Sequence, residues 1–230
     1  MRILGIVLLL GALISGSALV VLLESEPESA PARPQPSPTP PSASPAEPTP
    51  TVAVPRLRER RRYVFPVRGG ASYGAAHHDY PAADMFADCG TPVVTPASGV
   101  VLQVTRRDSW DWGDDAPALR GGLSWSVGGD DGVRYYGSHL RAISDGVRRG
   151  EWIPAGTRIG TVGQTGNAAG TGCHLHFGIS PLCERPDGWW VRRGIIPPYA
   201  FLRAWESGRD RSPANAIRRW QRTHRCPPGP

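Results

Sequence analysis

Short apolar runs, each ended by glycine or proline, dominate the sequence between Tyr63 and Trp205. The 230 residues include 28 glycines and 25 prolines, which favour turns and linkers over long helices. Stretches such as VRYYGSHL carry the β-branched and aromatic residues that strands prefer, and a turn-forming GGDDG precedes this one. No ten-residue amphipathic pattern of the helical kind interrupts the series. The sequence therefore predicts a mostly β, antiparallel domain with short hairpins over residues 63–205.

The residues that follow this region have a different pattern. The stretch SPANAIRRWQRTHR offers Ser212 as a helix N-cap and Pro213 as the first helical residue. We therefore expect a short helix within a C-terminal tail, residues 206–230.

The first 24 residues are typical of a membrane-directed segment. The run from Ile3 to Leu23 is uncharged and almost wholly apolar, and roughly 20 such residues span a bilayer as a helix. We expect a signal-anchor, with a signal peptide cleaved near Ala18 as the alternative. The first interpretation makes the chain a single-pass protein of the cell membrane with an extracytoplasmic C-terminal domain, and the second makes it secreted.

Residues 25–62 read as a Pro-rich disordered linker that ends in a basic run, RLRERRR. Proline, serine, alanine, threonine and glutamate leave too little apolar surface for a core, and an extended proline-rich tether of this length reaches up to about 100 Å. The basic run is either a solvated charge cluster or a contact with anionic wall polymer. The formal net charge of +6 allows anionic surroundings in general, but an exported chain with only scattered RGG and RRG elements is not expected to bind nucleic acid.

Five of the six histidines fall in three short segments, which is the pattern of a metal site. Residues two apart on a strand face the same side, so His174 and His176 point together while Leu175 and Phe177 face the core. A catalytic zinc takes three histidine or carboxylate ligands and leaves one position open. A plain β domain whose histidines have no function is the competing interpretation. The candidate residues are His77, His78, Asp84, His139, His174 and His176.

The order of these segments resembles the lysostaphin-type (LytM-like) zinc endopeptidases, which cut peptidoglycan peptides. The motifs HHDYPAAD, GTPV, YYGSHL, IGTVGQTG and HLHF follow one another as they do in that family. The resemblance covers roughly Val64 to Ser180 and implies a zinc cleft in the β domain. It implies zinc ligands at a histidine of the first motif, at Asp84 and at His176, with His174 and His139 beside the catalytic water as base and oxyanion stabiliser.

Two departures from the family pattern bear on this site. The family has three residues between the first histidine and the aspartate, whereas His78 has five and His77 has six. We expect His78 to be the ligand, with His77 as the alternative and with Asp79 or the other histidine orienting it. The second departure is Gly178, where many relatives carry glutamate.

The resemblance implies a Zn²⁺-dependent endopeptidase that hydrolyses peptide bonds of peptidoglycan at the cell surface. The alternative is a catalytically weak or inactive module of the same fold, which binds peptidoglycan or activates an amidase. With either function, the protein could also have a regulatory partner in the cell wall. A biotinyl or lipoyl carrier, which has similar glycine-rich hairpins, is excluded because it needs a lysine and this chain has none.

Four cysteines and three tryptophans carry further expectations. An antiparallel pairing that brings Asp84 opposite His176 displaces Cys89 and Cys173 in the same direction. We therefore expect Cys89–Cys173 and Cys183–Cys226 disulfides, with free buried thiols as the alternative. Trp110, Trp112 and Trp125 lie in or beside an insertion between strands, where they would either wall a substrate groove or pin a surface loop.

Overall fold

The computed structural model describes residues 62–183 and 188–226, all within one compact unit of the chain. The expected signal-anchor, residues 1–24, lies outside the described residues, as does all of the expected linker except Arg62. Among the described residues, none of the helices has both the length and the apolar character needed to cross a bilayer.

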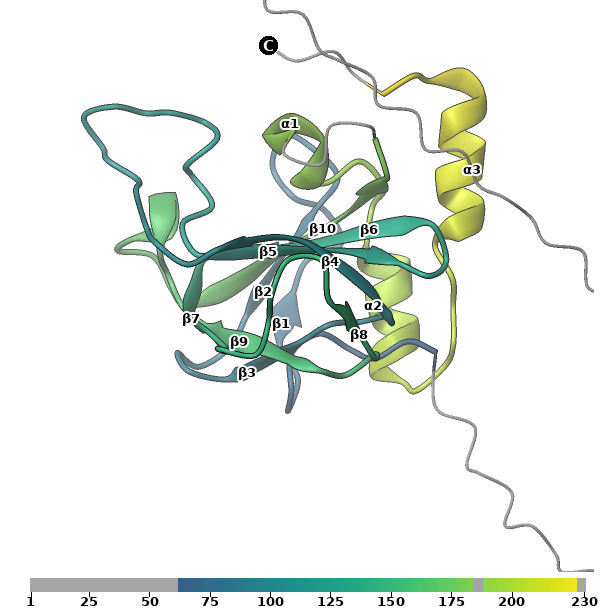
Figure 1. The fold of residues 1–230 in the computed structure, drawn as a ribbon, viewed down its shortest axis with the longest axis horizontal. Coiled ribbons are helices and arrows are strands. Elements are labelled where there is room, and N and C mark those ends of the chain that lie inside the picture. The colour runs from purple at the N-terminus through teal and green to yellow at the C-terminus, as the bar shows by residue number, and fades with distance from the viewer. Residues whose placement is uncertain (1–61, 184–187, 227–230) are drawn as a thin grey trace, which may run out of the picture. The chain divides into compact units, whose positions relative to one another are not determined.

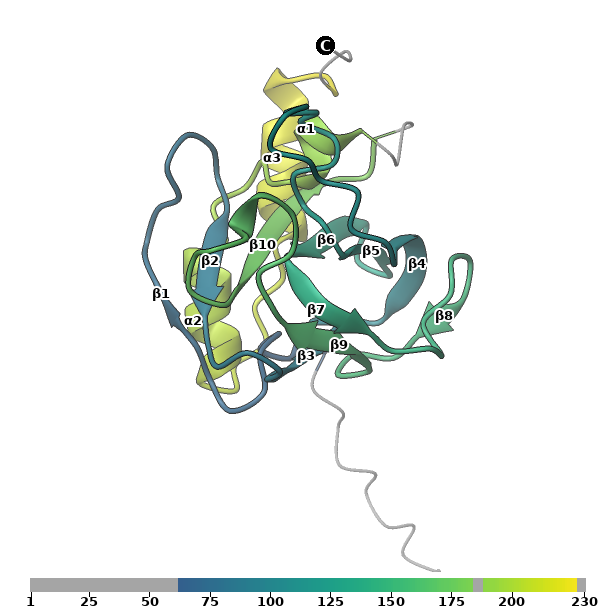
Figure 2. The same ribbon diagram turned by 90° about the vertical axis from the view of Figure 1, so that its left-hand side faces the viewer.

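Ten strands form two sheets, and every strand pair between described residues is antiparallel (Figures 1 and 2). The larger sheet has the order β1-β2-β10-β6-β5-β4-β8 and the smaller one β3-β9-β7. The predicted mostly β, antiparallel architecture is therefore confirmed. The strands are β1 (Ser72–Tyr73), β2 (Ala83–Phe86), β3 (Pro92–Val94), β4 (Gly99–Thr105), β5 (Ser124–Gly129), β6 (Val133–Ser138), β7 (Leu140–Ile143), β8 (Trp152–Ile153), β9 (Arg158–Val162) and β10 (His174–Pro181).

Strand β10 carries the paired histidines through the middle of the larger sheet. It pairs with β2 on one side and β6 on the other, and all eight of its residues are buried. Leu175, Phe177 and Ile179 contribute to the hydrophobic core with no exposed surface. Because side chains alternate along a strand, His174 and His176 face the opposite side, as the sequence predicts.

Three short helices follow β10: α1 (Trp189–Arg192), α2 (Tyr199–Glu206) and α3 (Ala214–Thr223). The predicted C-terminal helix is α3, which begins one residue later than expected, and the Ser212 hydroxyl accepts a hydrogen bond from the Ala214 amide at 3.2 Å. The sequence pattern did not reveal α1 or α2, and the expected domain boundary at residue 205 cuts through α2. Helix α2 belongs to the core, because the buried Trp205 ring stacks on that of Tyr63.

All four cysteines are paired, as Cys89–Cys173 and Cys183–Cys226. Both expected disulfides are thus confirmed. The first bond ties the loop after β2 to the residue before His174 and so fixes the start of the histidine strand. The second joins the chain beyond β10 to the residues that follow α3.

The loop between β4 and β5, residues 106–123, is the long excursion at the upper left of Figure 1. Trp125 follows this loop but lies in the core on β5 with 1% of its surface exposed, so it cannot wall a groove. Trp112 is 67% exposed, and its ring meets that of Trp110 edge to face. This contact agrees with the interpretation of aromatics that pin a surface loop.

Candidate metal centre

A cleft of about 370 Å³ collects five of the six histidines. The register of β2 on β10 places Asp84 directly opposite His176, and the register of β10 on β6 places His176 opposite Ser138, the residue before His139. The His77 loop (residues 74–82), which joins β1 to β2, supplies the remaining side of the group. The 106–123 loop also borders the cleft, through Pro117, Ala118, Arg120 and Gly121 rather than through its tryptophans. The histidines are His77, His78, His139, His174 and His176.

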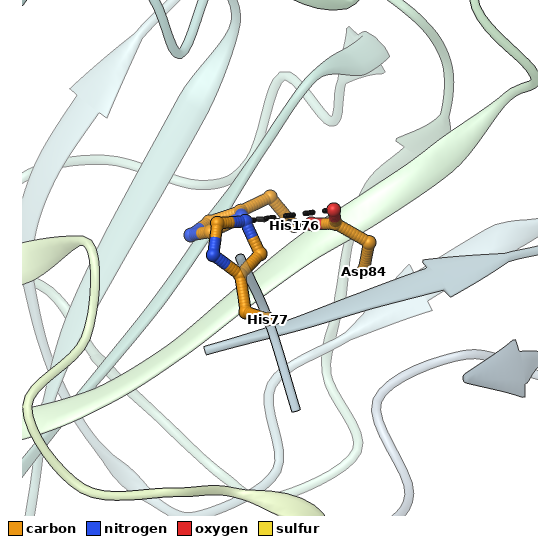
Figure 3. A group of neighbouring side chains, drawn as sticks. All are labelled: His77, Asp84 and His176. Carbon is orange, nitrogen blue, oxygen red and sulfur yellow. Dashed lines mark hydrogen bonds and ion pairs between the residues drawn. The ribbon is translucent and has the colours of Figure 1, made fainter. Parts of the chain in front are cut away.

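Three side chains in this cleft converge closely enough to hold a metal ion (Figure 3). One ligand atom each from His77, Asp84 and His176 lies within 4.8 Å of the others. The His176 Nδ1 is 2.9 Å from Asp84 Oδ1, and the His77 Nε2 is 3.5 Å from Asp84 Oδ2. The sequence favours His78 as the first histidine, but the structure brings the alternative, His77, into the group. His78 lines the same cleft, and its ring centroid is 5.3 Å from that of His77.

The hydrogen bonds of His176 require a cation beside it. Its Nε2 lies 3.0 Å from the Arg193 carbonyl oxygen, which can only accept, so Nε2 carries a hydrogen and donates. In the neutral imidazole, Nδ1 then presents a lone pair to the Asp84 carboxylate 2.9 Å away, and two acceptors would repel each other at this distance. A proton or a metal ion between them removes the conflict, and a metal-ligating histidine typically donates its other nitrogen to a carbonyl in this manner.

Gly178 makes the contact between His176 and Arg193 possible. A Cβ at this position would lie 2.4 Å from the Arg193 carbonyl oxygen, so any larger residue would push that carbonyl away. The backbone after β10 returns over the strand at this point, where the Ile195 and Ile196 amides donate to the Ile179 carbonyl. The departure from the family pattern at 178 thus has a structural reason: a backbone carbonyl occupies the space that a side chain would fill.

The same turn, Arg193–Gly194, holds the lengthened His77 loop. The Arg193 guanidinium lies 4.0 Å above the Tyr80 ring, and a Cβ on Gly194 would meet the Pro81 carbonyl oxygen at 2.0 Å. The loop therefore packs tightly on the segment that also contacts His176. Tyr80 and Pro81 belong to the longer His-to-Asp spacing, and these contacts bring His77 back to Asp84.

The electrostatics of the group keep the Asp84 carboxyl ionised and favour a neutral His77. Burial raises the pKa of the Asp84 carboxyl, but the hydrogen bond from His176 and the charges of His176 and His77 outweigh this effect and lower it to about 2. Burial also lowers the pKa of His77. An ionised carboxylate with a neutral imidazole is the form that metal coordination needs near neutral pH.

His139 and His174 lie side by side in the cleft, with ring centroids 5.0 Å apart. The His139 Nδ1 is 2.8 Å from the Thr165 carbonyl oxygen, and the His174 Nδ1 is 2.8 Å from that of Gly172. Because a carbonyl only accepts, each Nδ1 carries the hydrogen, and each neutral ring keeps a lone pair on Nε2. Burial, with the neighbouring charges of His176 and His174, lowers the pKa of His139 to about 3.

The backbone at His139 is strained, which singles out this residue. Its φ is 64°, and it is the one described residue other than glycine with a positive φ. Such a conformation costs roughly 1–3 kcal/mol and persists where the surroundings enforce it, commonly at functional sites. Here the His139 amide donates to the Gly121 carbonyl, which fixes the junction of β6 and β7 against the 106–123 loop.

Sequence reasoning missed several residues that shape the cleft. Tyr80, Tyr136, Arg192 and Arg193 all line it. The two tyrosines stand inside quoted motifs but were not singled out, and neither a motif nor a spacing marked the two arginines. The one signal that pointed toward Arg193 was the unusual glycine at 178.

Several known proteins are similar to this chain. Residues 78–187 match the model of Peptidase family M23. A curated relative, the L-Ala–D-Glu endopeptidase of Bacillus subtilis (strain 168), is 29% identical over 160 residues, which are 63% of this chain and 43% of that protein. The chain thus matches less than half the length of that relative.

Solved structures of peptidases are also similar. The catalytic domain of the antimicrobial peptidase lysostaphin from Staphylococcus simulans is 24% identical, with a TM-score of 0.44 over 58% of this chain and 92% of that one. A zinc containing peptidase from Vibrio cholerae is 21% identical, with a TM-score of 0.42 over 59% of this chain and 39% of that one. The family match over residues 78–187 confirms the resemblance inferred from the ordered motifs.

Proposed function

We propose that this protein is a zinc-dependent endopeptidase that hydrolyses peptide bonds of peptidoglycan at the cell surface. The observation that carries the proposal is the convergence of His77, Asp84 and His176 in a cleft that also holds His139 and His174. One group of side chains can bind a metal, and the other offers lone pairs for proton transfer.

The residues present fit zinc. Two imidazole nitrogens and one carboxylate oxygen are the donor set of a catalytic zinc site, and a fourth position stays open for water or substrate. When bound, zinc polarises the scissile carbonyl and makes a water molecule acidic near neutral pH. Asp84 and His176 would hold the ion from the strands, and His77 would hold it from the loop. The Arg193 carbonyl would fix the ring orientation of His176.

The two remaining histidines would carry the protons. His174 has its Nδ1 hydrogen engaged by Gly172, so its Nε2 can accept a proton from the attacking water and later deliver it to the leaving amine. His139 also presents a lone pair, and its low pKa keeps it neutral. It could donate to the developing oxyanion only with a hydrogen on Nε2, and that proton would have to come from the attacking water instead of passing to His174.

The substrate and the location rest on the family and on the disulfides. The relative from Bacillus subtilis is named for an L-Ala–D-Glu bond, which supports a peptide of the bacterial wall as substrate. Two disulfides with no free cysteine suit an oxidising, extracytoplasmic compartment. We propose that residues 1–24 anchor the chain in the cell membrane, with secretion as the alternative.

The longer spacing before Asp84 favours a second candidate function. In this function a module of the same fold binds peptidoglycan, or activates an amidase, without cleaving peptidoglycan itself. The full chain, incubated with purified peptidoglycan, separates the two. The endopeptidase releases soluble fragments with new amino termini, and chelation stops the release until zinc is returned. Peptidoglycan that binds the zinc-loaded protein without gaining amino termini would establish the binding module instead.

A further inference from the structure

Two neighbouring arginines at the end of α1, Arg192 and Arg193, line the histidine cleft. Neither makes an ion pair with any acidic residue in the described part of the chain. Arg192 also lines an adjoining cavity of about 230 Å³. Two cations of this kind beside a reaction site raise the question of which anion they receive.

Arg192 is a buried cation with neutral partners. It is 7% exposed, its Nη1 donates to Gln103 Oε1 at 2.6 Å, and its Nη2 donates to the Ala118 carbonyl at 3.0 Å. Its guanidinium carbon lies 5.4 Å from the centre of the Tyr136 ring. These contacts satisfy hydrogen bonds but leave the charge uncompensated, and buried charges in proteins are normally paired.

Arg193 is held rigidly and has a donor to spare. Its guanidinium carbon lies 4.0 Å from the centre of the Tyr80 ring and 5.2 Å from that of Trp189, and aromatic faces of this kind fix a planar cation. Its Nε is buried and lacks a hydrogen-bond partner among the described residues. A donor kept away from water and left unpaired costs stability, which a bound acceptor would recover.

The remaining charges of the cleft do not neutralise this pair. Arg120 lines the cleft but is paired with Asp115. Asp84 is engaged by His176 and His77. Asp79 is the other acidic residue of the lining, and it makes no ion pair with either arginine.

The pair is also close to the proposed reaction centre. The Tyr136 ring centroid lies 6.2 Å from that of His176, and its face receives Arg192. The Arg193 carbonyl accepts the hydrogen bond from His176 itself. An anion bound by the two guanidinium groups would therefore lie beside the bond that the histidine cleft acts on.

We propose that Arg192 and Arg193 form a carboxylate-binding subsite, so that the preferred substrate is a peptide with a free carboxylate near the bond that is cut. Guanidinium groups suit this task because their fixed, planar donors match the geometry of a carboxylate. The subsite itself stands on the contacts above. Only the statement that the carboxylate lies near a scissile bond rests on the proposed endopeptidase function.

Matched peptides test the subsite directly. Capped tetra-alanine peptides carry one glutamate or one glutamine, of L or D configuration, at each position in turn, so each pair differs only in carboxylate against carboxamide. Binding to the full chain in detergent is measured with zinc and after its removal, because zinc alone could attract a carboxylate. The variants are Arg192→Gln, Arg193→Gln, Arg192→Lys and, as a control on an exposed arginine remote from the cleft, Arg209→Gln.

The expected result is a glutamate peptide that binds about 10- to 100-fold more tightly than its glutamine partner, with or without zinc. Arg192→Gln and Arg193→Gln should bring the ratio toward one, Arg192→Lys should keep part of it, and Arg209→Gln should keep all of it. If Arg192 is purely structural, Arg192→Gln lowers thermal stability but leaves the ratio intact, and that result overturns the two-arginine subsite. Equal binding within every pair, or a ratio that survives both glutamine variants, overturns the subsite. Lack of peptidoglycan cleavage with the ratio intact overturns the proposed function instead.

Discussion

Two regions build the histidine cleft, and they differ in how their geometry is fixed. Strands β2 and β10 supply Asp84, His174 and His176 through backbone register, in which each residue has a defined partner and a defined face. The His77 loop supplies the first histidine through contacts made far along the chain, with Arg193 and Gly194. The strand half of the metal site, Asp84 and His176, is therefore fixed by strand register. The loop half, His77, depends on one local packing arrangement.

The largest effect should come from the strand half. Asp84→Ala and His176→Ala each remove one of three proposed zinc ligands. The loss of zinc affinity should therefore exceed the 10- to 100-fold that is typical when a hydrogen-bond partner of a ligand is removed. We expect zinc affinity to fall by about 1,000-fold or more in either variant, measured by competition with a chelator. Full zinc content in both variants would show that the ion, if bound, is held elsewhere.

A smaller loss of zinc affinity should follow when the contact between His176 and the Arg193 carbonyl is weakened. Gly178→Ala puts a Cβ against the Arg193 carbonyl, which must move away from His176 Nε2. We expect zinc to bind about 10- to 100-fold more weakly, as for other lost partners of metal ligands. Gly146→Ala is the matched control, because no heavy atom lies within 4 Å of a Cβ there. Equal zinc affinity in the two variants would mean that the carbonyl does not orient His176.

A smaller effect is expected on the unfolding free energy of the zinc-free protein in acid. The Asp84 carboxyl has a pKa of about 2 in the folded chain against 3.8 as the ordinary value. Its contribution is therefore fully present above about pH 4 and is lost as the pH falls toward 2, and it amounts to about 2 kcal/mol. Urea unfolding between pH 5 and pH 2 should show a shallower loss in Asp84→Asn. Parallel slopes would contradict the side-chain contact between the Asp84 carboxylate and His176.

The strand half was predictable from the sequence because alternation and register are properties of the backbone. Two histidines two residues apart must share a face, and an antiparallel partner that brings Asp84 to His176 also brings Cys89 to Cys173. The loop half was not predictable, because its path depends on Arg193 and Gly194, more than a hundred residues away in sequence. The eight residues of α2 were missed for another reason: two turns are too few to show a helical period clearly.

The choice between His77 and His78 is where the two regions meet. Spacing along the sequence favours His78, and the matched family segment begins at that residue. The packing of Tyr80 and Pro81 on the Arg193–Gly194 turn instead directs the His77 Nε2 toward Asp84. The two histidines are adjacent, and each alanine variant removes one imidazole. A difference in zinc affinity between the variants therefore shows which of the two side chains the loop directs toward Asp84.

The most direct test is therefore the zinc content and zinc affinity of the full chain beside His77→Ala and His78→Ala. We expect about one zinc per chain in the unmodified protein, loss of that zinc in His77→Ala, and a change of less than about threefold in His78→Ala, because only the former removes a ligand of the converging group. Retention of zinc in His77→Ala, or no zinc binding by the unmodified chain when zinc is supplied, would contradict the account.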